Sequence, residues 1–236
     1  NIWLGQKDGG LSMAYTGSER INSVMPHSIK EPYLPNETIR AVTKDSRGKI
    51  WLGYYTKGLY CYNDKSRLFE KFKIEKAASN TDWERIRTLF TSSDGTIWAG
   101  TYKGILRISG NKCTSYENGN IQGMPVNRCY SIYEDQNKQL WMGCWGGLIK
   151  FNLTTGSFEK FKGQELLNKY NIRCVRKNHQ NLILATESDG VIVFNLTTGT
   201  LKNITTQDGI LGNSIYSVFV DNQSDNYWIA SLGGVT

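Results

Sequence analysis

The sequence predicts an all-β protein of the β-propeller class, in which four-stranded antiparallel blades follow one another along the chain. Three observations predict it. A short aromatic motif recurs at a regular interval, each interval has the composition of short β-strands, and turn-forming residues separate those strands. Intervals of about 40–50 residues are typical of propeller blades.

Six copies of the aromatic motif define the repeat, and consecutive copies begin 43 to 48 residues apart. The copies are Ile2–Gly5, Ile50–Gly53, Ile97–Gly100, Leu140–Gly143, Ile183–Thr186 and Tyr227–Ala230. The last two are weaker: Leu184 stands in place of the Trp in the fifth copy, and Thr186 and Ala230 stand in place of the Gly. The repeat covers essentially the whole chain.

The interval from Thr38 to Lys73 shows one complete blade. Between its strands, Asp45 to Gly48 and Thr56 to Gly58 have turn chemistry, and a third turn begins at Asn63. The expected strands are Ile39–Lys44, Ile50–Tyr54, Leu59–Tyr62 and Leu68–Phe72. Four short antiparallel strands joined by tight turns make one blade.

The other copies follow the same plan. Asn152–Gly156 and Asn195–Gly199 have one sequence, Asn-Leu-Thr-Thr-Gly, and fall at the third turn of two later blades. One strand position carries Trp3, Trp51, Trp98, Trp141 and Trp228. We interpret these tryptophans as packing between blades, because an indole buries a large area and its N–H can still find a partner.

The repeat predicts a single propeller over residues 1–236 with a partial blade at each end. Both partial blades contain a second strand, so they overlap, whereas a closed propeller needs one terminus to complete the blade begun by the other. We therefore expect a fragment of a larger propeller, for which seven blades is one option. The expected blades are 1–35, 36–82, 83–125, 126–168, 169–212 and 213–236.

The composition indicates a folded domain. Of 236 residues, 39% are hydrophobic, which is ample for a core, and no run of 18 apolar residues occurs. The net charge is +7, from 28 Lys and Arg against 21 Asp and Glu. A basic excess favours anionic partners, but these charges are scattered, which favours a solvated surface. We expect this region to bind no nucleic acid.

The cysteines and histidines predict no metal site, and no cofactor is expected. His27 and His179 are far apart, no CxxC spacing occurs, and zinc needs clustered ligands. The five cysteines are Cys61, Cys113, Cys129, Cys144 and Cys174. Buried free thiols are the favoured interpretation, and one disulfide stays open if the compartment is oxidising.

One pattern links these features to a known family. From Ile39 to Asn63 the chain reads Ile-x-x-Val-x-x-Asp-x-x-Gly-x-Ile-Trp-x-Gly, followed by Lys-Gly-Leu and Tyr-Asn, and Asp135 to Asn152 is equally close. This pattern resembles the two-component regulator propeller repeat. The resemblance implies the periplasmic ectodomain of an inner-membrane hybrid histidine kinase, from Gram-negative bacteria that live on polysaccharides, in which oligosaccharide binding is relayed to a kinase and regulator. It implies that the membrane-spanning and phosphorelay parts lie outside this sequence, and it leaves a homodimer of the full-length protein open.

Two groups of residues are candidates for ligand binding. Aromatic residues that follow the second strands suit stacking on sugar rings, and long variable connections lie on the same face; these are Tyr55, Tyr102 and Trp145. Matched positions near the start of the first strands, by the expected central channel, hold Arg40, Arg87, Arg173, Tyr130 and Tyr216. Converging arginines would bind a carboxylate or sulfate, which suits an acidic oligosaccharide. The alternatives are that the aromatics pack beneath their own loops and that each arginine pairs with an acid such as Glu37 or Glu84.

Three functions compete on this evidence. The first is a non-catalytic sensor domain for an oligosaccharide, the second is a propeller enzyme of the lyase or hydrolase type, and the third is a protein-interaction propeller. Catalysis is disfavoured, because His27 and His179 fall on opposite faces and no triad or paired-carboxylate motif occurs.

Overall fold

The computed structural model divides into two compact units, Asn1–Ser115 and Tyr116–Thr236, which are described in turn. Its described residues are 2–5, 11–14, 21–24, 34–63, 65–118, 124–221, 224 and 226–236, with only the backbone described for 2–5, 14 and 21–24. Among these residues, regular structure consists of short strands and four 3-10 helices, and no helix is long and apolar enough to cross a membrane.

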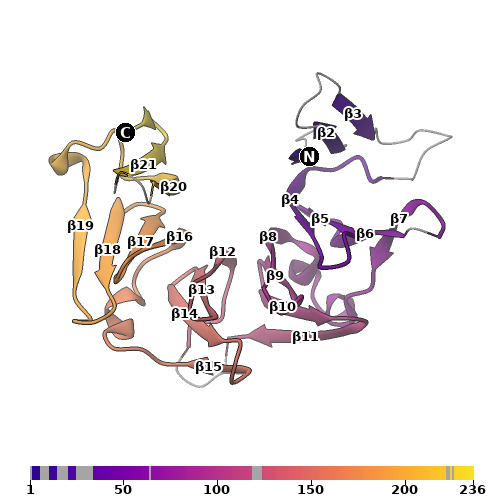
Figure 1. The fold of residues 1–236 in the computed structure, drawn as a ribbon, viewed down its shortest axis with the longest axis horizontal. Helices are drawn as coiled ribbons and strands as arrows, with labels where there is room; N and C mark the ends of the chain where they lie inside the picture. Colours follow the sequence, from indigo (N-terminus) through magenta and orange to yellow (C-terminus); the bar gives the residue numbers. More distant parts are fainter. Residues whose placement is uncertain are drawn as a thin grey trace. The chain divides into compact units, whose positions relative to one another are not determined.

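The first unit contains three sheets in its described residues, each built from strands that are consecutive in the chain (Figure 1). The connection between the second and third sheets carries the 3-10 helices η1 (Glu75–Ala78) and η2 (Thr81–Glu84). The strands are β1 (Ile2–Gly5), β2 (Leu11–Ala14) and β3 (Ile21–Val24); β4 (Ile39–Lys44), β5 (Ile50–Tyr54), β6 (Leu59–Asn63) and β7 (Leu68–Phe72); and β8 (Ile86–Thr91), β9 (Ile97–Thr101), β10 (Gly104–Ser109) and β11 (Lys112–Glu117).

The second unit likewise contains three sheets among the residues described, and their neighbouring strands pair antiparallel. The 3-10 helices η3 (Gln164–Leu167) and η4 (Thr206–Asp208) lie between sheets. The strands are β12 (Cys129–Glu134), β13 (Gln139–Cys144), β14 (Gly147–Asn152) and β15 (Ser157–Glu159); β16 (Ile172–Asn178), β17 (Asn181–Thr186), β18 (Val191–Asn195) and β19 (Leu201–Ile204); and β20 (Ile215–Asp221), β21 (Asn226–Ser231) and β22 (Gly234–Val235).

The four strands expected between Thr38 and Lys73 are confirmed as β4 to β7. The first turn forms because the Asp45 carboxylate accepts the backbone N–H groups of Arg47 and Lys49 at 2.9 and 2.8 Å, while Gly48 takes a φ of 87°. The short 3-10 helices in the connections were not anticipated, because segments of three or four residues carry no usable periodicity.

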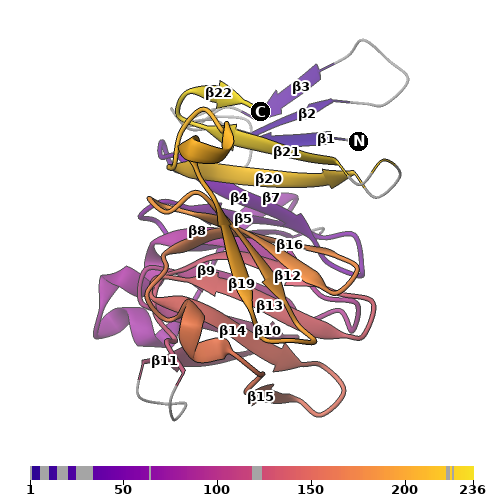
Figure 2. The ribbon, with the colours of Figure 1, turned by 90° about the vertical axis from the view of Figure 1, so that its left-hand side faces the viewer.

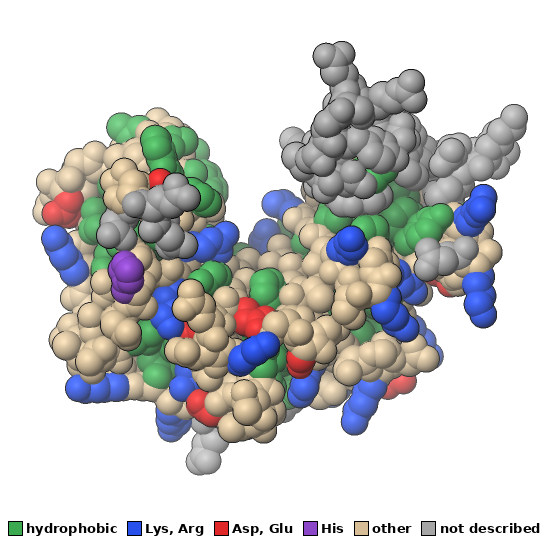
Figure 3. All heavy atoms as spheres, viewed as in Figure 1, with side chains coloured by type: hydrophobic (Ala, Val, Ile, Leu, Met, Phe, Trp, Pro, Cys, Tyr) green, Lys and Arg blue, Asp and Glu red, His purple; other side chains and the backbone are tan. Residues whose placement is uncertain are grey.

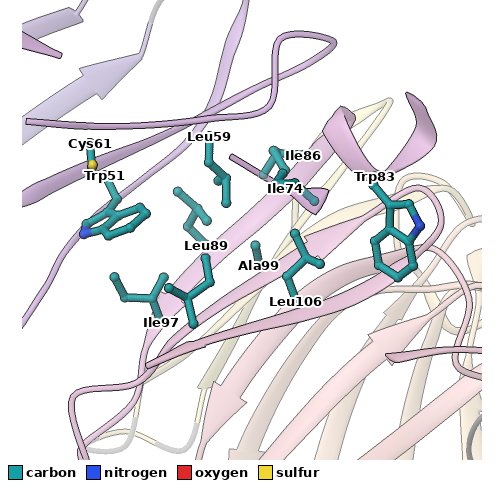
Figure 4. Close-up of a cluster of buried hydrophobic side chains, with 11 residues drawn as sticks. Trp51, Leu59, Cys61, Ile74, Trp83, Ile86, Leu89, Ile97, Ala99 and Leu106 are labelled. Atoms are coloured by element: carbon teal, nitrogen blue, oxygen red, sulfur yellow. The ribbon is translucent and has the colours of Figure 1, made fainter. Parts of the chain in front are cut away.

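The recurring tryptophans pack between sheets and anchor their own turns. Trp51 is 5% exposed and shares a buried cluster with Leu89 and Ile97 of the next sheet (Figure 4). Its indole N–H donates to Asp45 at 3.4 Å. The Trp141 indole N–H likewise donates to the Asp135 carboxylate at 3.1 Å, and the Trp98 indole N–H donates to the Ser92 hydroxyl. The interpretation as inter-sheet packing is thus confirmed for Trp51 and Trp141. Trp228 differs, since it is 55% exposed, and the side chain of Trp3 lies outside the described residues.

The glycine of the aromatic motif is required by close approach of the next sheet. A Cβ on Gly143 would lie 2.7 Å from Cγ2 of Ile172 and 2.9 Å from its carbonyl oxygen. A Cβ on Gly53 would lie 2.5 Å from Cγ2 of Ile86. Heavy atoms cannot approach so closely without displacement, so the small residue sets the spacing between neighbouring sheets.

The fifth copy of the motif corrects the sequence alignment by one residue. Ile183 pairs with Arg176 as Trp51 pairs with Thr43, so Ile183 occupies the Trp position and Ala185 the Gly position. The expectation that Leu184 and Thr186 hold these positions is wrong. The reason is a tighter first turn, in which Asn178 pairs with Asn181 and leaves two residues between them.

Candidate functional site

Each of five first strands has a register irregularity at its start, and a candidate residue lies at each one. The first strand's partners shift there by one residue, which is the mark of a β-bulge. The residues at these irregularities are Arg40, Arg87, Tyr130, Arg173 and Tyr216. Because a bulge re-aims the side chain at the extra residue, these positions are set apart from the regular alternation of the strand.

A backbone contact that recurs in three sheets brings the two groups of candidate residues to the same end of the sheet. The N–H of Tyr55 donates to the carbonyl of Thr38 at 3.0 Å, that of Tyr102 to Arg85 at 3.1 Å, and that of Trp145 to Arg128 at 2.8 Å. The aromatic residue after the second strand therefore lies beside the residue that precedes the first strand, two positions before the bulge.

In the first unit these positions assemble an arginine–tyrosine cluster, consisting of Arg40, Tyr55, Arg85, Arg87 and Tyr102. The guanidinium carbon of Arg40 lies 4.9 Å from the ring centre of Tyr55. Those of Arg85 and Arg87 lie 3.6 and 4.2 Å from the ring centre of Tyr102. The two tyrosine rings meet edge to face, 6.2 Å apart. Such contacts hold cations over aromatic faces.

Hydrogen bonds fix the cluster further. Arg85 donates to the Tyr55 hydroxyl at 3.1 Å and to Asp82 at 3.2 Å, and Arg87 donates to the Tyr102 hydroxyl. Hydrogen bonds from Tyr102 and Arg85 lower the pKa of Tyr55. Burial, together with the bond to Tyr55, raises the pKa of Tyr102. The two phenols are therefore inequivalent, and Tyr55 is the more acidic of them.

In the second unit Arg173 is held by an acid, as the structural alternative anticipated, although by a different residue. It forms an ion pair with Glu187 at 2.6 Å, donates to Ser214 at 3.3 Å and lies 5.4 Å from the ring centre of Tyr216. Glu187 also accepts from Asn171 at 3.1 Å. The structure thus joins Arg173 with Tyr216, and separately Arg40 with Arg87. That all three arginines converge on one channel stays a prediction.

The remaining candidates are exposed or half-buried. Trp145 is 37% exposed, and the guanidinium of Arg128 lies 5.0 Å from its ring. Tyr130 is half-buried on β12. Sequence reasoning missed Arg85 and Arg128, which precede the first strands of the third and fourth sheets. A usable signal was present: both stand two residues before a candidate residue at a bulge.

A cavity of about 530 Å³ lies at the other end of the fourth and fifth sheets, between their first turns, and sequence reasoning did not point to it. Its lining includes Asp135, Lys177 and His179. Asp135 and Lys177 form an ion pair at 2.7 Å, and Asp135 also binds the Trp141 indole. These charges are engaged in joining sheets. We therefore favour the arginine–tyrosine cluster as the candidate site.

In the described part of the chain, the structure contains neither a metal-binding cluster of side chains nor a disulfide. No group of three or more His, Cys, Asp or Glu gathers there as a ligand set. His179 is exposed at the first turn of the fifth sheet, and His27 lies outside the described residues. All five thiols are free, four of them buried, and burial raises the pKa of Cys113 to about 11.

Lys and Arg side chains are spread over the face drawn in Figure 3.

Comparisons with solved structures establish the class of fold. The chain superimposes on the extracellular domain of a putative hybrid two-component system of B. thetaiotaomicron, with a TM-score of 0.74 and 21% identity, covering 99% of this chain and 30% of that one. It also matches virginiamycin B lyase of Staphylococcus aureus, with a TM-score of 0.66 and 14% identity over 99% of this chain and 77% of the other. The protein is a β-propeller, as its repeat predicted.

Two segments of the chain match a family of propeller repeats. Residues 33–56 and 123–146 match the family described as two component regulator propeller. A curated relative, histidine kinase P4 of Formosa agariphila, is 23% identical over 87% of this chain. The chain spans 19% of that relative and 30% of the B. thetaiotaomicron ectodomain.

Proposed function

We propose that this chain is a non-catalytic, ligand-sensing part of the periplasmic ectodomain of a hybrid two-component histidine kinase, and that its arginine–tyrosine cluster binds the acidic group of an oligosaccharide. The repeat family, the extracellular domain that it superimposes on and the histidine kinase relative support the sensor assignment. In this proposal, other parts of the polypeptide carry the signal across the membrane and perform the phosphorelay.

The single observation that carries the ligand class is the gathering of Arg40, Arg85 and Arg87 around two tyrosines. Acids among the described residues also lie near it. Asp82 binds Arg85, and the pKa of Glu37 is lowered by a hydrogen bond from Thr56 and, to a smaller extent, by the charge of Arg40. The cluster thus brings three guanidinium groups together among the described residues. A planar guanidinium matches the two oxygens of a carboxylate or sulfate, so an acidic sugar suits this arrangement.

The cluster is also organised in advance of binding. Arg85 and Arg87 are each held by a tyrosine hydroxyl and by an aromatic face, and the backbone bond from Tyr102 to Arg85 fixes the strands that carry them. A ligand that meets groups already in place loses less conformational entropy on binding. Tyr55 and Tyr102 can in addition stack against the apolar face of a sugar ring.

Calorimetric titration of the protein carrying residues 1–236 tests the proposal. Oligosaccharides with carboxylate or sulfate groups should bind more tightly than neutral ones of equal length, and the difference should shrink at high salt. Replacing Arg87→Gln should weaken the acidic ligand about 10–100-fold, the usual value of a hydrogen bond to a charged group. Arg87→Lys should bind the acidic ligand with an affinity between those of the wild type and Arg87→Gln, because lysine keeps the positive charge and lacks the planar guanidinium.

Arg107→Gln is the matched control, because it removes the same charge from β10, where Arg107 lies 5.4 Å from the Trp98 ring. It should bind like the wild type. Equal affinity for acidic and neutral sugars, or equal loss in Arg87→Gln and Arg107→Gln, would dismiss the ligand class. Mass spectrometry of the incubated sugars separates the rival functions: cleavage would support a propeller enzyme, and neither binding nor cleavage would favour a protein-interaction propeller.

A further inference from the structure

We propose that Cys129 and Cys144 form an intramolecular disulfide across β12 and β13, a modification site beside Tyr130 and Trp145. The proposal rests on the extracytoplasmic location within the proposed function, because disulfides persist in oxidising compartments. Both cysteines are free thiols in the structure and both are fully buried.

Strand register places the two cysteines directly opposite each other. Cys129 is the pairing partner of Cys144 across the neighbouring strands β12 and β13, which lie side by side in both ribbon views (Figure 2). The next pair outward, Arg128 and Trp145, is joined by a backbone hydrogen bond of 2.8 Å. Since bonded and non-bonded pairs alternate in an antiparallel ladder, the cysteines form a non-bonded pair, whose Cα atoms typically lie about 4.5 Å apart. A disulfide spans Cα separations of about 4.4–6.8 Å.

The local environment fits the same pairing. Burial, followed by a hydrogen bond from Cys129, raises the pKa of the Cys144 thiol well above its ordinary value. Burial and strand register therefore single out the same pair of thiols. By comparison, the pairing partners of Cys61 are Trp51 and Glu70, and Cys174 lies opposite Ala185.

The chemistry needs an oxidant and a time when the thiols are accessible. Forming the bond between the two Sγ atoms releases two protons and two electrons, which a disulfide of a thiol–disulfide oxidoreductase or oxidised glutathione accepts to become two thiols. Thiolate is the attacking species, and in the folded protein both sulfur atoms are buried away from an oxidant. The disulfide therefore forms while the hairpin is assembling, before the neighbouring sheets cover it.

The cross-link would act through the backbone on two candidate ligand-binding residues of the second unit, Tyr130 and Trp145. Cys129 precedes Tyr130, which lies at the bulge of β12, and Cys144 precedes Trp145, which follows β13. Joining the two sulfurs fixes the ends of both strands where these side chains emerge. The fourth sheet thereby gains a covalent cross-link at the end that carries Tyr130 and Trp145.

Peptide mapping provides the test. The protein carrying residues 1–236 is refolded with oxidised glutathione and, in parallel, with a reductant; free thiols are then alkylated after denaturation. We expect the oxidised sample to lose two alkylation sites and to yield one cross-linked peptide that joins Cys129 to Cys144. Reduction should lower its Tm by about 5–10 °C. Full alkylation of both cysteines, or a cross-link between other cysteines, would overturn the proposal.

Two double variants serve as controls. Cys129→Ala with Cys144→Ala should make the Tm insensitive to reductant, whereas Cys61→Ala with Cys174→Ala should retain the wild-type difference. The peptide map of the unaltered protein does not depend on either variant folding. Because refolding is done in vitro, failure to form the bond counts against this inference alone, while failure to bind acidic sugars counts against the proposed function.

Discussion

The ion pair between Asp135 and Lys177 offers a sharp test of how neighbouring sheets are held together in the second unit. The side chains are 2% and 16% exposed and 2.7 Å apart. The same carboxylate accepts the Trp141 indole N–H at 3.1 Å and the backbone N–H groups of Asn137 and Gln139 at 2.9 and 3.1 Å. Asp135 thus binds backbone groups of its own turn, a tryptophan of its own sheet and a lysine of the sheet that follows.

Replacing Asp135→Ala should lower the free energy of unfolding by about 3–5 kcal/mol, because it leaves a largely buried ammonium without its partner. Asp45→Ala is the matched comparison in the second sheet. Asp45 accepts two equivalent backbone hydrogen bonds, from Arg47 and Lys49, and one from the Trp51 indole. Because its removal breaks hydrogen bonds alone, Asp45→Ala should lower the free energy of unfolding by about 1–2 kcal/mol. Adding Lys177→Met to Asp135→Ala should recover at least about 1 kcal/mol, since the orphan charge is removed.

Urea denaturation followed by tryptophan fluorescence measures these differences, provided that the m-value is unchanged. If Asp135→Ala costs no more than Asp45→Ala, or if Lys177→Met brings no recovery, the reasoning from the buried pair is refuted. The pH dependence supplies a second check. Burial raises the pKa of the Asp135 carboxyl, but hydrogen bonds from Lys177 and Trp141 outweigh it, and the pKa lies below its ordinary value.

A lowered folded pKa means that the contribution of Asp135 is fully present above its unfolded pKa of about 3.9 and is lost as the pH falls through the folded value. The advantage of the wild type over Asp135→Asn should therefore be constant at neutral pH and shrink only below about pH 4. An advantage that shrinks between pH 7 and 5 would contradict this assignment.

The remaining predictions concern sheet packing and the second ion pair. Gly143→Ala should cost about 1–3 kcal/mol, because its Cβ would collide with the next sheet. Trp141→Phe should cost about 2 kcal/mol through the lost indole bond and a small void, whereas Trp228→Phe should change stability by less than about 0.5 kcal/mol at an exposed position. Glu187→Gln should cost less than about 1 kcal/mol, since its pair with Arg173 is partly solvated.

Urea denaturation checks each of these variants, and each has a result that would contradict it. Equal losses in Trp141→Phe and Trp228→Phe would mean that burial in the described sheets does not set the energetics. A wild-type stability for Gly143→Ala would show that the sheets can separate without cost. A loss above about 2 kcal/mol in Glu187→Gln would indicate an ion pair that is less solvated than its partial exposure suggests.

Local chemistry made much of the fold predictable. The first turn of the second sheet follows from an aspartate that binds its own backbone and a glycine at positive φ. The two Asn-Leu-Thr-Thr-Gly turns share one backbone hydrogen bond. The N–H of Gly156 donates to the carbonyl of Asn152, and that of Gly199 to the carbonyl of Asn195, each at 2.9 Å. Interactions between residues at most four positions apart depend on the local sequence alone, so they can be predicted one segment at a time.

The sequence by itself determined the period, the strands of the Thr38–Lys73 blade, the turns between them and the class of fold. Only the tertiary structure decided where the register slips at Arg40 and its equivalents, which arginines meet Tyr55 and Tyr102, and that Lys177 lies on Asp135. The physical reason is distance along the chain. These contacts join residues that lie between 15 positions apart, as for Arg40 and Tyr55, and 42 positions apart, as for Asp135 and Lys177. Their geometry depends on bulges and on the packing of whole sheets, which no local pattern encodes.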